Sequence, residues 1–352
     1  MSDSVPAADV PQPRPKRRKL KRLARCFAVY VLLPYVVIVV ILALFQRSLI
    51  YQPVCETHVG IERARLPNGQ VHPVTVTTHD GLTLNGWHIL PDGRTAADKA
   101  ECDRELARGG LLVLYFYGNA GSRVNDVHDC RDFTSLGCHV FLFDYRGYGD
   151  NEGSPSESGL AADASAVWKY AVSDRGVAPE RILVFGQSLG GAVAIRLAAE
   201  ACREGASLAG LVVCSTFSSM ADVAQWHYPY FPVRLLLVDR FPSVERIGSI
   251  RCPFLSFHGT RDDIVPLEIG RKLFDSAPES SASSIAKRFV ELPGAAHNDV
   301  PRRAFQRGVR EFLENIQPSI RKDAPEGPPR VAPFRASPTG AAQPQGAPTF
   351  TP

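Results

Sequence analysis

The stretch "RILVFGQSLGGAVAIRLAAE", residues 181–200, changes its pattern in the middle. An apolar run typical of a buried strand meets Gly-Gln-Ser-Leu-Gly-Gly and continues as an amphipathic helix. A serine hydroxyl is a weak nucleophile unless it is held exposed beside a base, and a tight turn from a strand into a helix holds it in that way. We therefore predict that Ser188 is a catalytic nucleophile and that the backbone N–H of Leu189 is one donor of an oxyanion hole.

The glycines around Ser188 allow a second interpretation. Gly186 and Gly190 are expected where a sharp turn leaves no room for Cβ atoms, but glycine-rich turns between a strand and a helix also bind phosphate. Residues 186–191 lack the GxGxxG and GxxxxGKS spacings of phosphate-binding loops. The strand before the serine and the helix after it are the context that a nucleophile motif requires, so they favour the nucleophile.

Strands and helices alternate along most of the chain. The predicted strands lie at 111–116, 139–143, 182–185, 208–213, 254–257 and 287–292, after a β-hairpin formed by 74–78 and 82–90. The predicted helices lie at 124–136, 159–172, 189–200, 267–274 and 302–316. Because the strands are apolar throughout and separated by helices, we expect an α/β fold with a mostly parallel sheet flanked by helices on both faces.

The base for Ser188 must come from one of nine histidines. His297, in "LPGAAHNDVP", follows the last predicted strand and precedes the last helix, on a loop at the carboxyl edge of the sheet where Ser188 also lies. His258 follows its own strand closely and is the one rival. We predict that His297 is the general base, and we expect Asp299 to cap the final helix.

The acid that orients the base is expected after a strand and between Ser188 and His297 in chain order. The segment "FLSFHGTRDDIVP" offers two adjacent candidates, Asp262 and Asp263. One would accept the imidazole N–H, and the other would be solvated or would cap the next helix. The residues alone leave this choice open.

Residues 26–45, "CFAVYVLLPYVVIVVILALF", carry no charge over roughly the 20 positions that a helix needs to cross a bilayer. We predict a transmembrane helix in which Pro34 is tolerated and can form a kink. The alternatives are a cleaved signal peptide, for which the following residues offer no convincing cleavage site, and a buried core helix. Basic residues crowd into 14–25 and only Arg47 follows the span closely, so the positive-inside rule places the N-terminus in the cytoplasm and the catalytic domain in a periplasm or lumen.

Composition and charge limit the classes of partner that we expect. The 352 residues are 45% apolar, enough for one large domain, and the net charge of +4 comes from the basic cluster before the span. The remainder is mildly acidic, so we expect no nucleic-acid partner. The eight cysteines show no CxxC pair or metal-ligand spacing, so we expect no metal. A disulfide involving Cys102, Cys130 or Cys138 is permitted if the domain is extracytoplasmic.

Composition also divides the chain. We predict a basic disordered cytoplasmic tail at 1–25, the span at 26–45, the α/β domain at 46–317, and a disordered tail rich in Pro and Ala at 318–352. The connection at about 217–250 is long for a compact sheet and rich in aromatic residues. It predicts a cap over the site, with an ordinary packed helical excursion as the alternative.

Several segments together resemble the α/β-hydrolase superfamily, in particular its membrane-anchored α/β-hydrolase-domain serine hydrolases, a branch that includes depalmitoylase-like enzymes. The segments are "YFYGNAGS", "FDYRGYGDNEGSPSESGLAADA", "FGQSLGGAVA", "HGTRDDIVP" and "GAAHND", together with the N-terminal anchor and its "FQRSLIYQP" exit. They extend over most of residues 82–314. Jointly they are far more specific than any one of them.

The resemblance implies roles for particular residues. The nucleophile of GxSxG falls on Ser188, the aspartate of DxxVP on Asp262, and the histidine before Asn-Asp on His297. It also implies a second oxyanion donor in the loop after the 111–116 strand, which we expect to be the N–H of Asn119, with Ala120 as the alternative. Family sequences have His-Gly where this chain has Tyr117-Gly118, but a backbone donor does not depend on that side chain.

The sequence thus predicts a membrane-anchored serine hydrolase. Ser188 would attack a carboxylic ester or thioester of an acyl or lipid-like substrate, and no metal or organic cofactor is required. The alternatives are a peptidase of the same fold and a membrane-tethered binding protein without turnover. In "DYRGYG", we interpret Asp144 and Arg146 as a structural network near the site rather than as catalytic groups.

Overall fold

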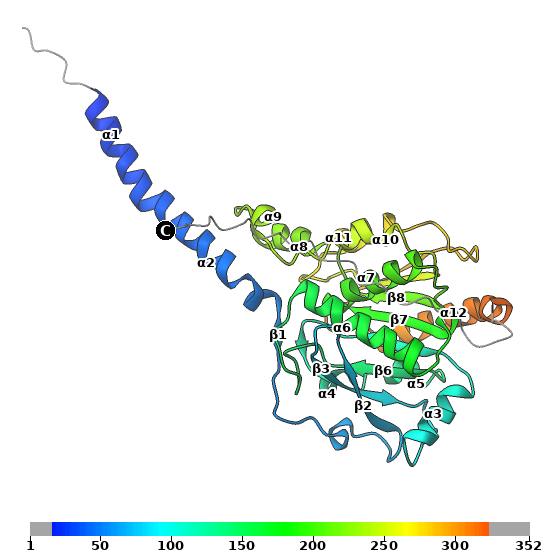
Figure 1. The fold of residues 1–352 in the computed structure, drawn as a ribbon. Coiled ribbons are helices and arrows are strands. Elements are labelled where there is room, and N and C mark those ends of the chain that lie inside the picture. Colours follow the sequence, from blue (N-terminus) through cyan, green and yellow to red (C-terminus); the bar gives the residue numbers. More distant parts are fainter. Residues whose placement is uncertain (1–15, 324–352) are drawn as a thin grey trace, which may run out of the picture. The chain divides into compact units, whose positions relative to one another are not determined.

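The computed structural model describes residues 16–323, with side chains for 20–316. The chain divides after Gln46 into two compact units (Figure 1). The predicted tails at 1–15 and 324–352 lie outside the described residues.

The first unit is helical from its first described residue. Helix α1 (Lys16–Phe27) passes through a π-helical turn (Ala28–Leu32) into α2 (Leu33–Ile50). Pro34 has no backbone N–H to donate to the preceding turn, and the π-helical turn ends just before it, at the predicted kink. The 31 residues Leu20–Ile50 form one helix that is long and apolar enough to cross a membrane.

Residues 16–25 were expected to belong to a disordered tail, but they are helical. Lys, Arg, Leu and Ala are strong helix formers, and the apolar helix that follows removes the cost of nucleation. The basic cluster before the predicted span is therefore part of the same helix.

The second unit contains an eight-stranded sheet with the order β10-β9-β8-β7-β4-β6-β3-β2. All neighbours are parallel except at one edge, where β3 runs antiparallel to both β6 and β2. The predicted hairpin is this β2–β3 pair, joined by a turn in which Gly81 has a φ of 87°. The strands are β2 (Val71–Thr77), β3 (Thr83–Ile89), β4 (Leu112–Phe116), β6 (His139–Phe143), β7 (Ile182–Gln187), β8 (Gly210–Cys214), β9 (Phe254–Gly259) and β10 (Arg288–Leu292).

Helices cover both faces of this sheet (Figure 1). Residues on opposite faces of β9 show the two layers, because Phe257 packs on Phe305 of α12 whereas Phe254 packs on Phe274 of α11. The α-helices are α3 (Lys99–Ala107), α4 (Arg123–Asp126), α5 (Arg131–Thr134), α6 (Glu157–Lys169), α7 (Leu189–Arg203), α8 (Met220–His227), α9 (Val233–Leu236), α10 (Ser243–Ile247), α11 (Leu267–Asp275) and α12 (Arg302–Asp323). Two short strands, β1 (Gln52–Pro53) and β5 (Ala120–Gly121), pair with each other. Three helical turns lie at Ile61–Ala64, Tyr170–Asp174 and Pro179–Arg181.

The predicted α/β fold is confirmed, and the differences are local. The helix expected at 124–136 is broken into α4 and α5, because Asn, Asp and His in "VNDVHDC" are poor helix formers. The final helix continues to Asp323, so residues 318–323, expected in the disordered tail, are helical. Helix α3 was not predicted, although its N-terminus carries a capping signal: the Asp98 carboxylate accepts the Glu101 N–H at 2.8 Å.

Candidate active site

Ser188 occupies a single-residue turn between β7 and α7. Its backbone has a φ of 51° and a ψ of −117°, a conformation that costs a non-glycine residue about 1–3 kcal/mol. A Cβ at Gly186 would lie under 3.0 Å from the backbone of Gly190, and a Cβ at Gly190 would lie under 3.0 Å from the carbonyl oxygen of Phe116 on β4. The turn therefore needs both glycines, and it holds the Ser188 side chain partly exposed at the carboxyl edge of the sheet.

The structure brings Ser188, His297 and Asp262 into one hydrogen-bonded chain. Ser188 Oγ lies 2.9 Å from His297 Nε2, and His297 Nδ1 lies 2.8 Å from Asp262 Oδ2. Because a carboxylate only accepts, the imidazole proton is on Nδ1, and Nε2 is left to accept the serine proton. This tautomer is the one that a general base for Ser188 requires.

The two adjacent aspartates have different surroundings. Asp262 is buried, and its Oδ1 accepts the backbone N–H groups of Ile264 at 3.1 Å and Val265 at 2.7 Å. These bonds fix the carboxylate so that Oδ2 faces His297. Asp263 is exposed at the surface. The structure thus brings Asp262, and not Asp263, to the imidazole.

The loop that carries His297 is held by Asp299. The expected role of Asp299 as the cap of the final helix is wrong, because its carboxylate instead accepts the N–H of Ala296. The final helix begins at Arg302, so Asp299 lies three residues before it and not at the N-cap position. The bond closes the loop around the imidazole.

His258, the rival base, lies behind the acid. Its Nε2 donates to the carbonyl of Val265 at 2.8 Å and lies 3.5 Å from Asp262 Oδ2, while its Nδ1 faces Gly270 without a hydrogen-bond partner among the described residues. Burial lowers the pKa of His258 despite the nearby carboxylate. The ring therefore supports the loop of Asp262 and does not contact Ser188.

One predicted oxyanion donor follows the serine directly in the chain, and the other belongs to a loop that passes close to it. Leu189 is the first residue of α7, so its N–H has no acceptor within the helix. Asn119 is held in place because its carbonyl, which shares a peptide with the Ala120 N–H, accepts the N–H of Gln52 at 3.0 Å and the hydroxyl of Tyr148 at 2.9 Å. A Cβ at Gly118 would lie 3.8 Å from Ser188 Cβ, so this loop passes close to the nucleophile. The alternative donor, Ala120, begins the short strand β5.

A buried ion-pair network lies beneath this loop, and the sequence indicated only part of it. Asp144 pairs with Arg123, whose side chain is 2% exposed, and accepts the hydroxyl of Tyr117 at 2.9 Å. Arg123 also binds Asp150 at 2.8 Å. Burial raises the pKa of Asp144, and the Arg123 guanidinium opposes that rise. Arg123 was not predicted as part of this network, because nothing in its local sequence pattern marks it as buried.

The Arg of "DYRGYG" belongs to a second network. Arg146 contacts Asp163 and Asp80, each at 2.8 Å. It therefore ties the turn after β6 to α6 and to the β2–β3 turn. Asp144 and Arg146 each serve a structural ion pair, but with different partners.

The 217–250 segment contains three short helices, α8, α9 and α10, and carboxylates fasten it. Asp222 on α8 accepts Arg234 Nη2 at 2.6 Å and Lys272 Nζ of α11 at 2.8 Å. Burial would raise the pKa of Asp222, but these bonds and one from Ser218 hold it at about 2. At the other end, Glu157 on α6 accepts the N–H of Phe241 at 2.8 Å.

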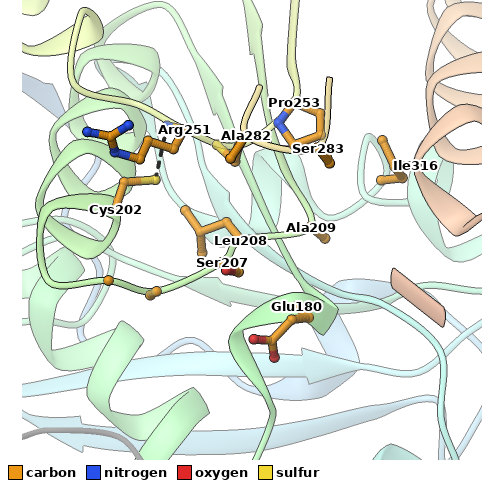
Figure 2. Close-up of a pocket in the computed structure, with 13 residues that line it drawn as sticks. Glu180, Cys202, Ser207, Leu208, Ala209, Arg251, Pro253, Ala282, Ser283 and Ile316 are labelled. Atoms are coloured by element: carbon orange, nitrogen blue, oxygen red, sulfur yellow. Dashed lines mark hydrogen bonds between the residues drawn. The ribbon is translucent and has the colours of Figure 1, made fainter. Parts of the chain in front are cut away.

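The described cavities lie apart from the candidate catalytic atoms. One cavity, of about 140 Å³, lies where α7 ends. Its lining includes Cys202, Arg251 and Ile316 (Figure 2). Another, of about 120 Å³, is lined by Gln187 and Asn298, the chain neighbours of Ser188 and His297. Neither includes Ser188, Asp262 or His297 in its lining.

The cysteines of the described residues form no disulfide. Cys102, Cys130 and Cys138 are buried and free, and the other cysteines of the described chain are free as well. Within residues 16–323, no group of three or more His, Cys, Asp or Glu side chains is arranged to hold a metal ion.

Comparison with known proteins agrees with this architecture. The family model described as serine aminopeptidase S33 matches residues 112–242. An uncharacterised protein of Mycobacterium tuberculosis is 39% identical over 302 residues, which cover 83% of this chain and 96% of that relative. Lysophosphatidylserine lipase ABHD12 of Danio rerio is 33% identical, with 60% of each chain covered, and that of Mus musculus is 32% identical, with 68% of this chain and 66% of the relative covered.

Solved structures share the fold at low identity. An α/β-hydrolase from Vibrio vulnificus aligns with a TM-score of 0.56 and 20% identity, covering 73% of this chain and 87% of its own. An esterase from Pyrococcus furiosus aligns with a TM-score of 0.53 and 20% identity, covering 76% and 98%. The chain spans 60–66% of the length of the two lipases.

Proposed function

The chain belongs to the α/β-hydrolase superfamily and is a serine hydrolase of the lipase and esterase type, and we propose that it is a membrane-anchored enzyme that removes the acyl chain from single-chain lipid esters. In this proposal Ser188 is the nucleophile, His297 the general base and Asp262 the residue that orients the base.

One observation carries the proposal: the unbroken hydrogen-bond chain from Ser188 Oγ through His297 to Asp262. Ser188 Oγ attacks the ester carbonyl while His297 Nε2 takes its proton. The imidazolium then protonates the leaving alcohol, and Asp262 stabilises the positive ring. Water, activated by the same imidazole, releases the acyl group in the second half of the reaction.

The oxyanion of each tetrahedral intermediate needs donors that are already in place. The N–H groups of Leu189 and Asn119 are our candidates, because Leu189 directly follows Ser188 and the loop of Gly118 and Asn119 passes close to it. Fixed donors in a site of low dielectric stabilise the developing charge without reorganisation. None of these steps requires a metal or an organic cofactor.

Membrane anchoring is supported by the long apolar helix near the N-terminus. The basic residues before the span and the single Arg47 just after it favour a cytoplasmic N-terminus. The catalytic unit would then face the periplasm or a lumen.

The names of the relatives support the substrate class. The Danio rerio and Mus musculus relatives are lysophosphatidylserine lipases, whose name denotes a phospholipid with one acyl chain. The family model instead carries the description of an aminopeptidase, so a peptidase of the same mechanism is the second candidate.

Substrate panels distinguish these possibilities. The purified full-length protein would be assayed with p-nitrophenyl esters of rising chain length, 1-oleoyl-lysophosphatidylserine, palmitoyl-coenzyme A as the thioester, and alanine p-nitroanilide. We expect turnover of the esters and the lysolipid, and its loss in Ser188→Ala. Preferential cleavage of the anilide would indicate the peptidase. Ester turnover that persists in Ser188→Ala would contradict the proposed nucleophile.

A further inference from the structure

The cap segment carries a surface of large apolar side chains, which we call the apolar cap surface. Its members are exposed over α8, α9 and the adjoining loops, with Leu235 80% and Trp226 58% exposed. Soluble monomers rarely expose so many large apolar groups in one short segment, and such patches usually mark a binding surface. The surface consists of Trp226, Tyr228, Tyr230, Leu235, Leu236 and Val238.

The carboxyl end of this surface is joined to the point where the chain leaves the candidate span. Asp239, which follows Val238, is buried and accepts Arg47 Nε at 2.9 Å and Tyr51 Oη at 3.1 Å. Arg47 is two residues after Phe45, so its Cα lies within about 7 Å of the end of the apolar segment however the chain turns. The polar headgroup layer is itself about 5–8 Å thick on each side of a bilayer. Asp239 is thereby tethered close to the membrane surface.

The chemistry of the segment fits lipid better than protein. Trp and Tyr are the side chains that prefer the boundary between headgroups and acyl chains, and the surface contains three of them. The exposed charges between 226 and 240 are those of Arg234 and Arg240, both cationic, as expected for a surface that faces anionic headgroups.

The surface also reaches the loop of the candidate acid. His227, at the end of α8, donates through Nε2 to the carbonyl of Ile264 at 2.9 Å. Ile264 is 46% exposed and lies two residues after Asp262. Because Asp222 clamps α8 to Arg234 and to Lys272 of α11, the apolar cap surface is held in a fixed position beside this loop.

We propose that the apolar cap surface inserts into the headgroup region of the bilayer that holds the N-terminal span, and that a single-chain lipid enters the site from there. The inference rests on the proposed membrane anchoring. A lipid that leaves the bilayer next to the Asp262 loop does not expose its acyl chain to water. The free-energy cost of such exposure grows with each CH₂ group.

The three tryptophans make the insertion measurable. Trp87 and Trp168 are 1% and 3% exposed, so Trp226 is the exposed indole. The full-length protein would be reconstituted into vesicles of phosphatidylcholine and phosphatidylglycerol, with or without brominated acyl chains, which quench an indole only on contact. We expect brominated lipid to reduce the Trp226 emission at least two-fold, with no such loss in Trp226→Phe. Unquenched Trp226 would overturn the proposal, and if iodide in the water also failed to quench it, a second protein copy would be the occupant.

A pair of variants links the surface to lipid turnover. Leu235→Glu combined with Val238→Glu should reduce the quenching and lower turnover of vesicle-borne lysolipid at least ten-fold, while p-nitrophenyl butyrate is cleaved as before. Ile61→Glu, at an exposed apolar position outside the surface, is the matched control and should change neither. Equal lysolipid turnover in the paired variant would contradict the entry route. If the wild-type protein did not cleave p-nitrophenyl butyrate, that result would count against the proposed hydrolase. The quenching of Trp226 by brominated lipid would still test whether the apolar cap surface inserts into the bilayer.

Discussion

Two regions of the molecule contain the same sequence of groups, a nucleophile, an imidazole and a partner. In one, Ser188 contacts His297, which contacts Asp262. In the other, Cys102 Sγ lies 2.9 Å from His88 Nδ1, and His88 Nε2 lies 3.0 Å from His139 Nδ1. A thiol is intrinsically the better nucleophile, so the contacts alone would favour the second region.

The surroundings of the two nucleophiles differ. Ser188 sits in a strained turn and is partly exposed, whereas Cys102 lies on the buried face of α3 and is 2% exposed. Burial raises the pKa of the Cys102 thiol to about 11, so the thiol stays protonated at neutral pH. The same burial keeps substrate away from it.

The partners of the two imidazoles differ as well. His297 has a carboxylate behind it, which stabilises the imidazolium that forms when the ring accepts a proton. His88 has a neutral imidazole behind it and the Arg175 guanidinium 3.4 Å from Nδ1. Burial lowers the pKa of His88, and Arg175 adds to the effect. The comparison teaches that a nucleophile–imidazole contact becomes a catalytic pair only with access and a negative partner.

The largest expected effect is at His297. Replacing it with Ala should lower kcat for p-nitrophenyl butyrate by about 10⁴- to 10⁶-fold, because among the described residues His297 is the base that contacts Ser188 Oγ. The assay is steady-state hydrolysis, with circular dichroism to check folding. A folded His297→Ala variant whose kcat is within ten-fold of the wild-type value would contradict the assignment of His297 as the base of the catalytic pair.

The next effect separates the two aspartates. Asp262→Asn should lower kcat by about 10³- to 10⁴-fold, since an amide NH₂ facing His297 favours the wrong imidazole tautomer while its oxygen can still accept from Ile264 and Val265. The exposed neighbour provides the control, because the kcat of Asp263→Asn should stay within about two-fold of the wild-type value. Equal losses in the two variants would mean that the negative partner has been misassigned.

A smaller effect concerns the stability of the second region at low pH. Burial lowers the pKa of His139 to about 4, below the value of about 6.5 for an unfolded chain. The unfolded state therefore binds more protons below pH 6.5, and His139 alone should remove on the order of 3 kcal/mol of unfolding free energy as pH falls from 6.5 to 4. Urea unfolding at pH 7.5, 6.0 and 5.0 measures the slope. His139→Gln, which keeps an acceptor for His88 but cannot titrate, should flatten it, and an unchanged slope would refute the assignment.

The smallest effect is at Cys102. Cys102→Ala should cost about 1–2 kcal/mol of stability through the lost hydrogen bond and packing, and should leave kcat within two-fold. The same urea titration and ester assay give both numbers on one preparation. A large loss of kcat in a stable Cys102→Ala protein would show that the second region takes part in the reaction.

Local patterns predicted the parts of the molecule that are determined locally. The turn at Ser188 was predictable because the strand, the two glycines and the helix are contiguous. The parallel sheet was predictable because its strands are apolar on both faces. The break between α4 and α5 and the start of α3 depend on weak propensities and capping, which a pattern of apolar residues does not register.

Contacts between distant segments were harder to predict. The partner of Asp144 is Arg123, 21 residues earlier, and its ion pair depends on how the turn after β4 folds back over β6. The choice between Asp262 and Asp263 depends on the direction of each side chain, which the sequence does not show for two adjacent residues. That choice came from the family motif. The Cys102–His88–His139 chain joins α3 to two strands, and no spacing in the sequence indicates it.

The central claim is that Ser188, and no other nucleophile in the chain, reacts through His297. Labelling the folded protein with a fluorophosphonate and mapping the adduct by mass spectrometry tests this directly. We predict one adduct, on the Ser188 peptide, that is absent in Ser188→Ala, strongly slowed in His297→Ala and unchanged in Cys102→Ala. An adduct on another residue, or equal labelling of Ser188→Ala, would contradict the account.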